Sequence, residues 1–255
     1  MSWYSLLHPD HIYTFLLLFV RLSTLFIFLP FYNHMSVPTQ IKAAFAFYLA
    51  IVLYPVVPVT PEPPTASAFF AAILSEVIMG LLAGLAMNIV FGIISYAGEQ
   101  ISFVMGFSMA SVIDPQTQVQ SPLVGQFLLL MATVVMLSFN GHYMMLMWMV
   151  DAIRTAPLGD IVMNHSMFDY LMNAMSGLFM FGFSIAFPII ALSLLSDVIF
   201  GMLMKTMPQF NLLVVGFPIK IFLSMSVWIA IFGSIMILFK THFLNAIDVL
   251  MRWIS

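Results

Sequence analysis

The sequence contains no cysteine, and only 7% of its 255 residues are charged. The absence of cysteine excludes disulfides, thiolate catalysis and metal sites built from cysteine. Soluble globular proteins carry about 25% charged residues, so an ordinary soluble domain is excluded as well. The seven Lys and Arg residues are scattered singly. Nucleic-acid binding requires a basic stripe, and nucleic acid is therefore not an expected partner.

Hydrophobic residues make up 63% of the sequence, and they gather in six apolar blocks. A helix needs about 20 apolar residues to cross the hydrocarbon core of a bilayer. The blocks predict an all-α, membrane-associated fold of about six long, kinked helices in hairpins, forming a single domain over residues 1–255. The expected helices cover residues 11–29, 39–54, 68–103, 122–150, 168–204 and 211–240. Residues 241–255 are expected to form a short amphipathic tail.

Two features distinguish the expected fold from an ordinary lipid-embedded bundle. Residues 68–103 and 168–204 would each form a helix more than about 50 Å long, against a hydrocarbon thickness of about 30 Å. Such helices must kink, tilt steeply or extend beyond the bilayer, and Pro188 predicts a kink or break in the second of them. With six spans, the basic residues also divide equally between the two sides, so the positive-inside rule gives no orientation.

The stretch Gly98–Pro122 connects the third and fourth apolar blocks, yet apolar residues crowd its first half. Exposing apolar surface to water costs roughly 25 cal/mol per Å², so this stretch is expected to pack against protein. Gly106 permits unusual backbone angles, and Asp114-Pro115 favours a turn. Irregular backbone at membrane depth is tolerated only where protein buries it or a water-filled cavity receives it. We therefore predict a re-entrant apolar loop between the third and fourth helices, facing a pore.

Small residues form a row along the third block. Gly80, Gly84 and Gly92 recur every four residues, with Asn88 between them. A row of this kind allows another helix backbone to approach closely. The alternative is that glycine is simply common in membrane helices.

A few polar side chains interrupt the apolar helices. A charged group at the centre of a bilayer costs at least about 2.5 kcal/mol, so a polar group there is a functional candidate by default. The buried polar candidates are Glu76, Glu99, Gln100, His142 and Asp197. Each carboxylate could serve a proton relay, or could simply lie at a helix end or bond to a neighbouring subunit. No nucleophile, base and carboxylate are spaced for catalysis, so no enzyme activity, cofactor or metal site is expected.

Several motifs resemble, in the same order and spacing, the FliR family of the flagellar type III export gate and its SctT counterparts in virulence secretion. They are Gly98-Glu99-Gln100-Ile101-Ser102, Met105-Gly106-Phe107-Ser108, Asp114-Pro115, Phe139-Asn140-Gly141-His142 with Pro157, and the group Lys205, Pro208, Gln209, Asn211, Gly216 and Pro218. The resemblance covers the whole chain. One departure is Lys205, where the family commonly has Arg; the charge is kept, but the planar guanidinium is not.

The resemblance implies a non-enzymatic gate subunit in the bacterial inner membrane, within the flagellar basal body. It implies assembly with FliP-like, FliQ-like and FlhB-like subunits, with lipid at least at the periphery, and passage of unfolded flagellar proteins. The family's plug loop corresponds here to residues 105–120. Its gate residues would be Met105, Gly106, Phe107, Ser108, Met109, Val112, Ile113, Asp114 and Pro115.

Two other functions stay open at this point. An ion-coupled secondary transporter would use Glu76, Glu99 and Asp197 as a relay. A gate subunit of a virulence secretion system would share every motif quoted above with its flagellar counterpart.

Overall fold

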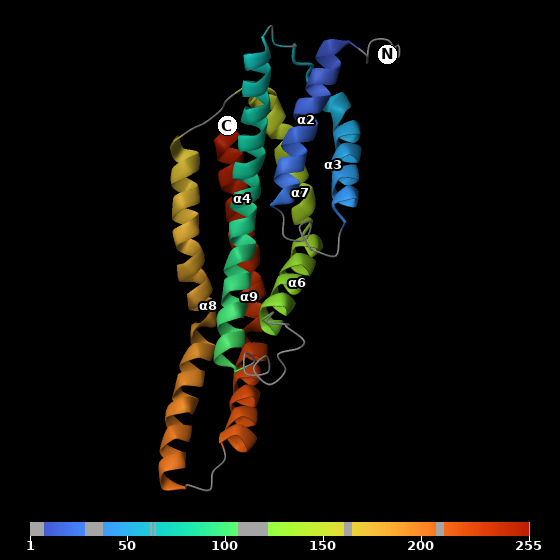
Figure 1. The fold of residues 1–255 in the computed structure, drawn as a ribbon. Helices are drawn as coiled ribbons and strands as arrows, with labels where there is room; N and C mark the ends of the chain where they lie inside the picture. The colour runs from blue at the N-terminus through green and yellow to red at the C-terminus, as the bar shows by residue number, and fades with distance from the viewer. Residues whose placement is uncertain are drawn as a thin grey trace. The chain divides into compact units, whose positions relative to one another are not determined.

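The computed structural model describes residues 8–28, 38–61, 63, 65–106, 122–160, 165–207 and 212–254. Within these ranges the chain forms seven α-helices and two short helices, η1 and η2, and no strand (Figure 1). The α-helices are α2 (Pro9–Ile27), α3 (Thr39–Leu53), α4 (Ala66–Val104), α6 (Leu123–Ser138), α7 (Gly141–Thr155), α8 (His165–Thr206) and α9 (Phe217–Ile254). The short helices are η1 (Tyr54–Val56), which is 3₁₀, and η2 (Leu212–Gly216), which is π-helical.

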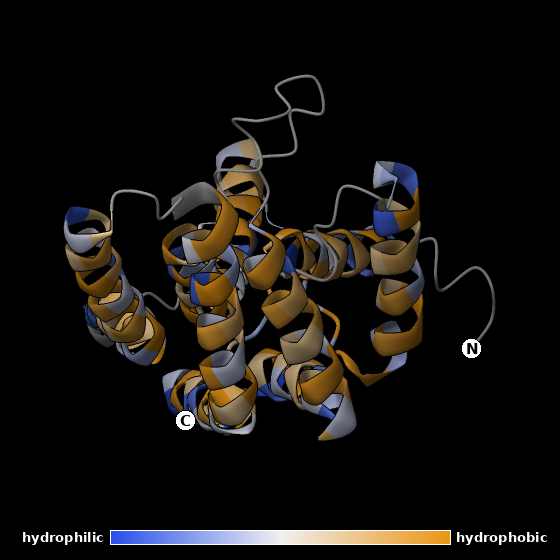
Figure 2. Ribbon diagram, turned by 90° about the horizontal axis from the view of Figure 1, so that it is seen from below, coloured by the Kyte–Doolittle hydropathy of each residue, from blue (hydrophilic) through white to orange (hydrophobic). Residues whose placement is uncertain are grey.

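Most of these helices are long and apolar enough to cross a membrane. Five such segments lie in the described residues, and a sixth is obtained if α6 and α7 are taken as one span interrupted by a short break. Hydrophobic residues predominate along the helical ribbons (Figure 2). The prediction of an all-α, membrane-associated fold with about six long apolar segments is confirmed.

Two of the predicted helix boundaries are wrong. The fourth helix was expected over residues 122–150, with Asn140-Gly141-His142 as its one polar interruption, but two helices form there: α6 ends at Ser138 and α7 begins at Gly141. Asn140 has φ 60, a left-handed conformation that ends a helix and that Asn tolerates better than most residues. The separate tail is also absent, since α9 continues to Ile254. No Gly or Pro follows Phe239 to end the helix. Pro188 lies inside α8 without breaking it.

The chain divides into two compact units, and α4, α8 and α9 each contribute to both. Unit 1 comprises Met1–Ile89, Phe139–Ala174 and Phe243–Ser255, and unit 2 comprises Val90–Ser138 and Met175–His242. A single domain over residues 1–255 stays a prediction.

In unit 1, α2 and α3 pack as a hairpin, and α2 buries one face. The buried positions follow the helical period along α2: Tyr13, Thr14, Leu17, Leu18, Arg21, Leu22, Leu25 and Phe26. Gly80 and Gly84 of α4 lie where α2 approaches most closely, because a Cβ on Gly80 would collide with Thr24 and one on Gly84 would lie 2.8 Å from Phe28. The side-chain amide of Asn88 donates to the carbonyl of Phe28 at 2.8 Å.

The remaining member of this row, Gly92, lies in unit 2 and faces α8. A Cβ there would lie 2.8 Å from a methyl group of Leu178. The row therefore receives two different helices, α2 along Gly80 and Gly84 and α8 at Gly92. This is the close approach that the spacing predicts, divided between two partners.

The core of unit 2 is formed by α4, α6, α8 and α9. Phe91 and Phe239 pack edge to face with ring centroids 5.1 Å apart, and Phe127 and Trp228 do so at 5.4 Å. Such pairs add to the stabilisation from burial. Other fully buried side chains from these helices include Ile94, Ala97, Ile101, Leu128, Ala132, Met136, Ala186 and Ile189.

Candidate functional site at the ends of segment 107–121

The C-terminal end of α4 is held in a turn at the point where the predicted loop begins. Met105 is fully buried, and its N–H donates to the carbonyl of Ile101 at 3.0 Å. Gly106 has φ +85, in the region that favours glycine, and a Cβ there would lie 3.3 Å from the ring of Phe217. The positive φ therefore makes glycine the favoured residue here, and the ring leaves little room for a Cβ.

The N-terminal end of α6 is bonded directly to the end of α4. The hydroxyl of Ser102 is buried and accepts a hydrogen bond from the N–H of Val124 at 3.2 Å. The first N–H groups of a helix have no partner within the helix, so this bond acts as an N-cap supplied by another helix. One turn earlier, the backbones of Gly98 and Gly125 touch, since a Cβ on Gly98 would collide with the Cα of Gly125.

A third helix completes the arrangement. Ser193 of α8 is buried, and its hydroxyl donates to the carbonyl of Val104 at 2.9 Å. The last carbonyls of a helix lack partners within it, so α8 satisfies the end of α4. The two ends of segment 107–121 are therefore fixed beside each other within unit 2.

Most of the predicted gate residues lie in this segment, outside the described residues. They are Phe107, Ser108, Met109, Val112, Ile113, Asp114 and Pro115. Of the nine, the structure describes Met105 and Gly106, both at the base. Sequence reasoning found this segment but missed Ser102, Gly125 and Ser193, the residues that hold its ends. Nothing in the local sequence distinguishes these three residues from other small residues of apolar helices.

Among the polar candidates, Glu76 is completely buried in unit 1, where it meets Arg21 of α2. Arg21 forms a two-pronged ion pair: its Nε contacts Oε2, and its Nη2 donates to Oε1 at 3.0 Å. The N–H of Gly159 also donates to Oε1 at 2.6 Å, and Arg21 Nη1 reaches the carbonyl of Ala156 at 3.5 Å. This pair thus connects α2, α4 and the turn after α7.

The sequence identifies Arg21 and Glu76 as charges within apolar blocks, but it does not show that they pair. Arg21 is the only charge in the first apolar block, residues 11–29, and Glu76 is one of two charges in the third, with Glu99 near its end. A charge buried in an apolar helix is costly unless it is paired. The presence of one positive and one negative charge in such helices could therefore have suggested that Arg21 and Glu76 form a pair.

The other polar candidates are less buried within this chain. Glu99, His142 and Asp197 are exposed, and Gln100 is half-buried. The expected burial of these side chains within the chain is therefore not observed. Asp197 pairs with Lys220 of α9, whose Nζ lies 2.7 and 2.9 Å from the two carboxylate oxygens. Glu76 belongs to unit 1, whereas Glu99 and Asp197 belong to unit 2.

The motif before the last helix is described only in part. Lys205 is exposed in the last turn of α8, where a cation suits the helix dipole. Gly216 is buried at the end of η2, and Pro218 lies exposed in the first turn of α9. Pro208, Gln209 and Asn211 lie outside the described residues. In the described ranges, no three His, Asp or Glu side chains come together as metal ligands would.

Comparison with known proteins gives the family. Residues 12–246 match the model for "Bacterial export proteins, family 1". The chain is 32% identical to the flagellar biosynthetic protein FliR of Bacillus subtilis over 92% of each chain. It is 30% identical to FliR of Escherichia coli, covering 79% of this chain and 77% of that one, and 24% identical to FliR of Aquifex aeolicus, covering 92% and 91%.

The matched region contains every described helix except the ends of α2 and α9, including the turn at Gly106 and both partners of the Arg21–Glu76 pair. The relatives named here are all flagellar proteins, and their lengths agree with that of this chain. The chain is a member of the FliR family of bacterial export proteins.

Proposed function

We propose that this chain is a subunit of a flagellar type III export gate in the bacterial inner membrane, within the basal body. In this proposal it forms, with FliP-like and FliQ-like subunits and next to an FlhB-like subunit, a channel for unfolded flagellar proteins. Residues 105–120 close that channel in its resting state. Family membership and the long apolar helices support the first part of the proposal.

One observation supports closure of the channel by residues 105–120. Both ends of segment 107–121 are held beside each other by Ser102, Ser193 and the Gly98–Gly125 contact. A segment anchored at both ends can occlude a passage without being carried away by a moving substrate. Because the base of the segment is held in place, its apolar part could move aside for a passing polypeptide and then return to the closed position.

The composition of the segment supports a seal. Phe107, Met109, Val112 and Ile113 offer a run of apolar side chains, and an apolar constriction blocks ions because water leaves it. Met side chains adapt to varied surfaces, which suits a seal that must close around different polypeptides.

Exposed apolar helix faces support assembly with other subunits. On α8, only a narrow stripe is buried, and the remaining side chains include Phe183, Phe187, Leu194 and Leu195. Asp197 lies on the exposed side of the same helix. A carboxylate facing lipid would be costly, so a neighbouring subunit suits this face better than lipid alone.

The test is electrical conductance of the complex. The chain is co-expressed with FliP-like and FliQ-like subunits, and the purified particle is reconstituted in planar bilayers. Deletion of residues 107–113 is expected to turn a closed particle into one that conducts small ions. An unchanged low conductance in particles of normal composition would refute the closure.

A matched pair of variants separates the seal from mere chain length. Replacing Phe107, Met109, Val112 and Ile113 by Leu keeps the apolar character and should leave the particle closed. Replacing the same four by Ser should make it leak. Co-purification of the other subunits with each variant shows whether the particle has assembled.

No observation favours the secondary transporter. The Glu76 carboxylate forms an ion pair with Arg21 and accepts a hydrogen bond from the N–H of Gly159, and Asp197 is paired with Lys220. Glu76 belongs to unit 1, whereas Glu99 and Asp197 belong to unit 2.

A further inference from the structure

The first part of α9 buries a row of polar side chains inside unit 2. Between residues 217 and 234, the buried residues are Lys220, Ser224 and Trp228, which recur every four positions along one face of the helix. A polar side chain is costly to bury unless it is hydrogen-bonded. Each of the three therefore needs a partner.

Lys220 has its partner, whereas Ser224 and Trp228 do not. The ammonium group of Lys220 is paired with Asp197. The hydroxyl oxygen of Ser224 and the indole nitrogen of Trp228 are both buried, and neither has a hydrogen-bond partner among the residues that the structure describes. Ser224 is completely buried, and Trp228 is 8% exposed. Two hydrogen-bonding groups thus lie one helical turn apart in the interior of the unit.

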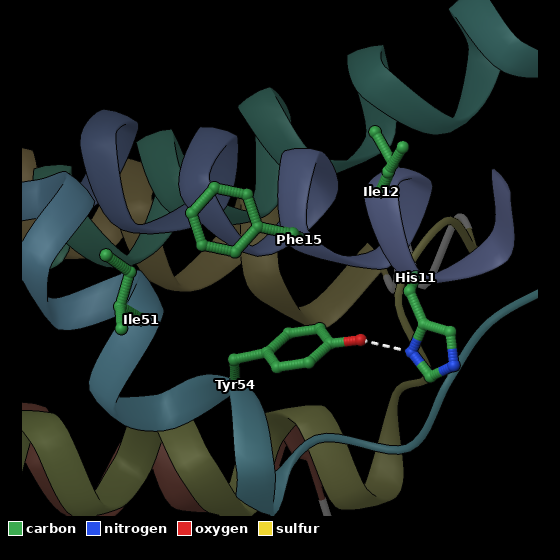
Figure 3. Close-up of a pocket in the computed structure, with 5 residues that line it drawn as sticks. All are labelled: His11, Ile12, Phe15, Ile51 and Tyr54. Atoms are coloured by element: carbon green, nitrogen blue, oxygen red, sulfur yellow. Dashed lines mark hydrogen bonds between the residues drawn. The ribbon is translucent and has the colours of Figure 1, made fainter. Parts of the chain in front are cut away.

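Comparable side chains elsewhere in the protein are satisfied. Ser226 of α9 donates its hydroxyl to the carbonyl four residues before it at 2.8 Å, and the buried indole of Trp148 donates to the carbonyl of Leu250 at 2.8 Å. In a pocket of about 270 Å³ lined by α2, α3 and η1, the Tyr54 hydroxyl is hydrogen-bonded to Nδ1 of His11 (Figure 3). Buried polar groups are normally bonded to protein or to ordered water, so the two groups on α9 call for a ligand.

The surroundings restrict the chemistry of that ligand. The Trp228 ring packs on Phe127 of α6 and on Phe232, with ring centroids 5.4 and 5.6 Å away. An indole N–H can only donate, so its ligand must offer an acceptor, and a cation does not. The charge of Lys220, one turn away, is already balanced by Asp197, so an anion would lack a counter-charge. A small neutral acceptor fits both conditions, and water is the simplest.

The spacing of the two groups suits one water molecule. Side chains four residues apart on a helix have Cβ atoms about 5–6 Å apart. A water molecule that forms two hydrogen bonds, each about 2.9 Å long, spans a similar distance. It would accept a hydrogen bond from the N–H of Trp228 and donate one to the hydroxyl oxygen of Ser224, since a hydroxyl can be donor and acceptor. Buried waters make about two to four such bonds.

We propose that an internal water molecule bridges the Trp228 indole and the Ser224 hydroxyl within unit 2. The water supplies the partner that each group lacks and stabilises the face of α9 that packs on Phe127. This site does not depend on the closure by residues 105–120, so the two proposals can fail separately.

Ultraviolet resonance Raman spectroscopy measures the hydrogen bond at the indole N–H. In the assembled particle, the spectrum of the wild type minus that of Trp228→Phe isolates the signal of Trp228. We expect the signature of a hydrogen-bonded N–H. In the Ser224→Ala background, the same subtraction should give a band shifted toward that of a free indole, because the water has lost its second partner. Ser226→Ala, which removes a hydroxyl already bonded to its own helix, should cause no shift.

The sign of a stability change gives a second, independent test. Removing a hydroxyl that bonds a buried water leaves the water under-bonded and lowers stability, whereas removing an unsatisfied hydroxyl is neutral or stabilising. Ser224→Ala should therefore unfold at a lower SDS fraction than the wild type in titrations followed by circular dichroism. Because one water serves both groups, the loss in the Ser224→Ala, Trp228→Phe double variant should be smaller than the sum of the two single losses.

Three results would overturn the proposal. A free indole N–H in the wild type would mean that nothing binds there. A hydrogen-bonded indole that Ser224→Ala leaves unchanged would assign Trp228 a different partner. An SDS midpoint that is unchanged or raised in Ser224→Ala would show that the hydroxyl is unsatisfied. Should Trp228→Phe fail to assemble, the titration of Ser224→Ala decides alone, since this variant removes a single oxygen.

Discussion

The two units of this protein are stabilised by different means. In unit 1 a completely buried ion pair, Arg21–Glu76, joins α2, α4 and the turn after α7. In unit 2 the helices at the base of segment 107–121 meet through backbone, at Gly98 and Gly125. Unit 2 also has an ion pair, Asp197–Lys220, but the Asp197 side chain is 53% exposed.

The difference shows that charged residues in apolar helices can have different structural roles. The Glu76 carboxylate accepts three hydrogen bonds, two from Arg21 and one from the N–H of Gly159, and its role is to hold three segments together. Asp197 has one partner and much solvent-accessible surface. Unit 1 thus depends on electrostatics in its interior, whereas the base of the segment in unit 2 depends on close packing.

The largest expected effect comes from breaking the buried pair. Glu76→Ala leaves the guanidinium of Arg21 buried without its partner, which costs about 3–5 kcal/mol. The variant should unfold at a much lower SDS fraction than the wild type in mixed-micelle titrations followed by circular dichroism.

The control for this variant removes both charges at once. Replacing Arg21 by Met and Glu76 by Leu leaves no unpaired charge, and apolar replacement of a buried pair is often neutral or stabilising. The double variant should therefore recover most of the lost stability. If Glu76→Ala unfolds like the wild type, the pair does not stabilise unit 1.

Much of the fold was predictable from composition alone. The apolar block 68–103 became α4 (Ala66–Val104), and the block 39–54 became α3 with η1. Hydrophobicity sets the existence and approximate ends of such helices, because every backbone polar group in a membrane must be satisfied internally. The break at Asn140 was harder to predict, since it depends on one residue adopting positive φ.

Pairings between distant residues could not be predicted in the same way. Arg21 and Glu76 are separated by 55 positions, and Ser102 and Val124 by 22. Only the packing of helices brings such residues together, and a single sequence does not specify that packing. The apolar segment after Gly106 could be located, but the residues that hold its ends could not.

An intermediate effect is expected at the backbone contact in unit 2. In Gly98→Ala the new methyl group would collide with the backbone of Gly125, so α4 and α6 must move apart. Overpacking of this kind typically costs about 1–3 kcal/mol. The same SDS titration measures the loss of stability.

Gly201 of α8 offers the matched control. No described atom lies within 4 Å of a Cβ built there, so Gly201→Ala should stabilise the helix by about 0.5–1 kcal/mol. If Gly98→Ala also stabilised the protein, close backbone packing would not be what holds the base of the segment, and the contrast between the units would fail.

The smallest effect is expected at the exposed ion pair. Asp197→Asn removes the charge but keeps an oxygen that can accept a hydrogen bond from the Lys220 ammonium. Because the Asp197 side chain is half exposed, solvent screens the pair, and ion pairs of this kind contribute about 0–1 kcal/mol. Salt should weaken the wild-type pair further, so the difference between wild type and Asp197→Asn should shrink in titrations at high ionic strength.

This last variant also distinguishes two sources of stability at Asp197. The Lys220 side chain is only 9% exposed, so an unpaired ammonium there could in principle be as costly as the unpaired guanidinium of Arg21. Its long, flexible stem allows the charged end to reach solvent, however, whereas Arg21 lies 2% exposed with Glu76 and Ala156 around it. A salt-independent loss as large as that of Glu76→Ala would show that Lys220 cannot reach solvent, and would make the two ion pairs equivalent.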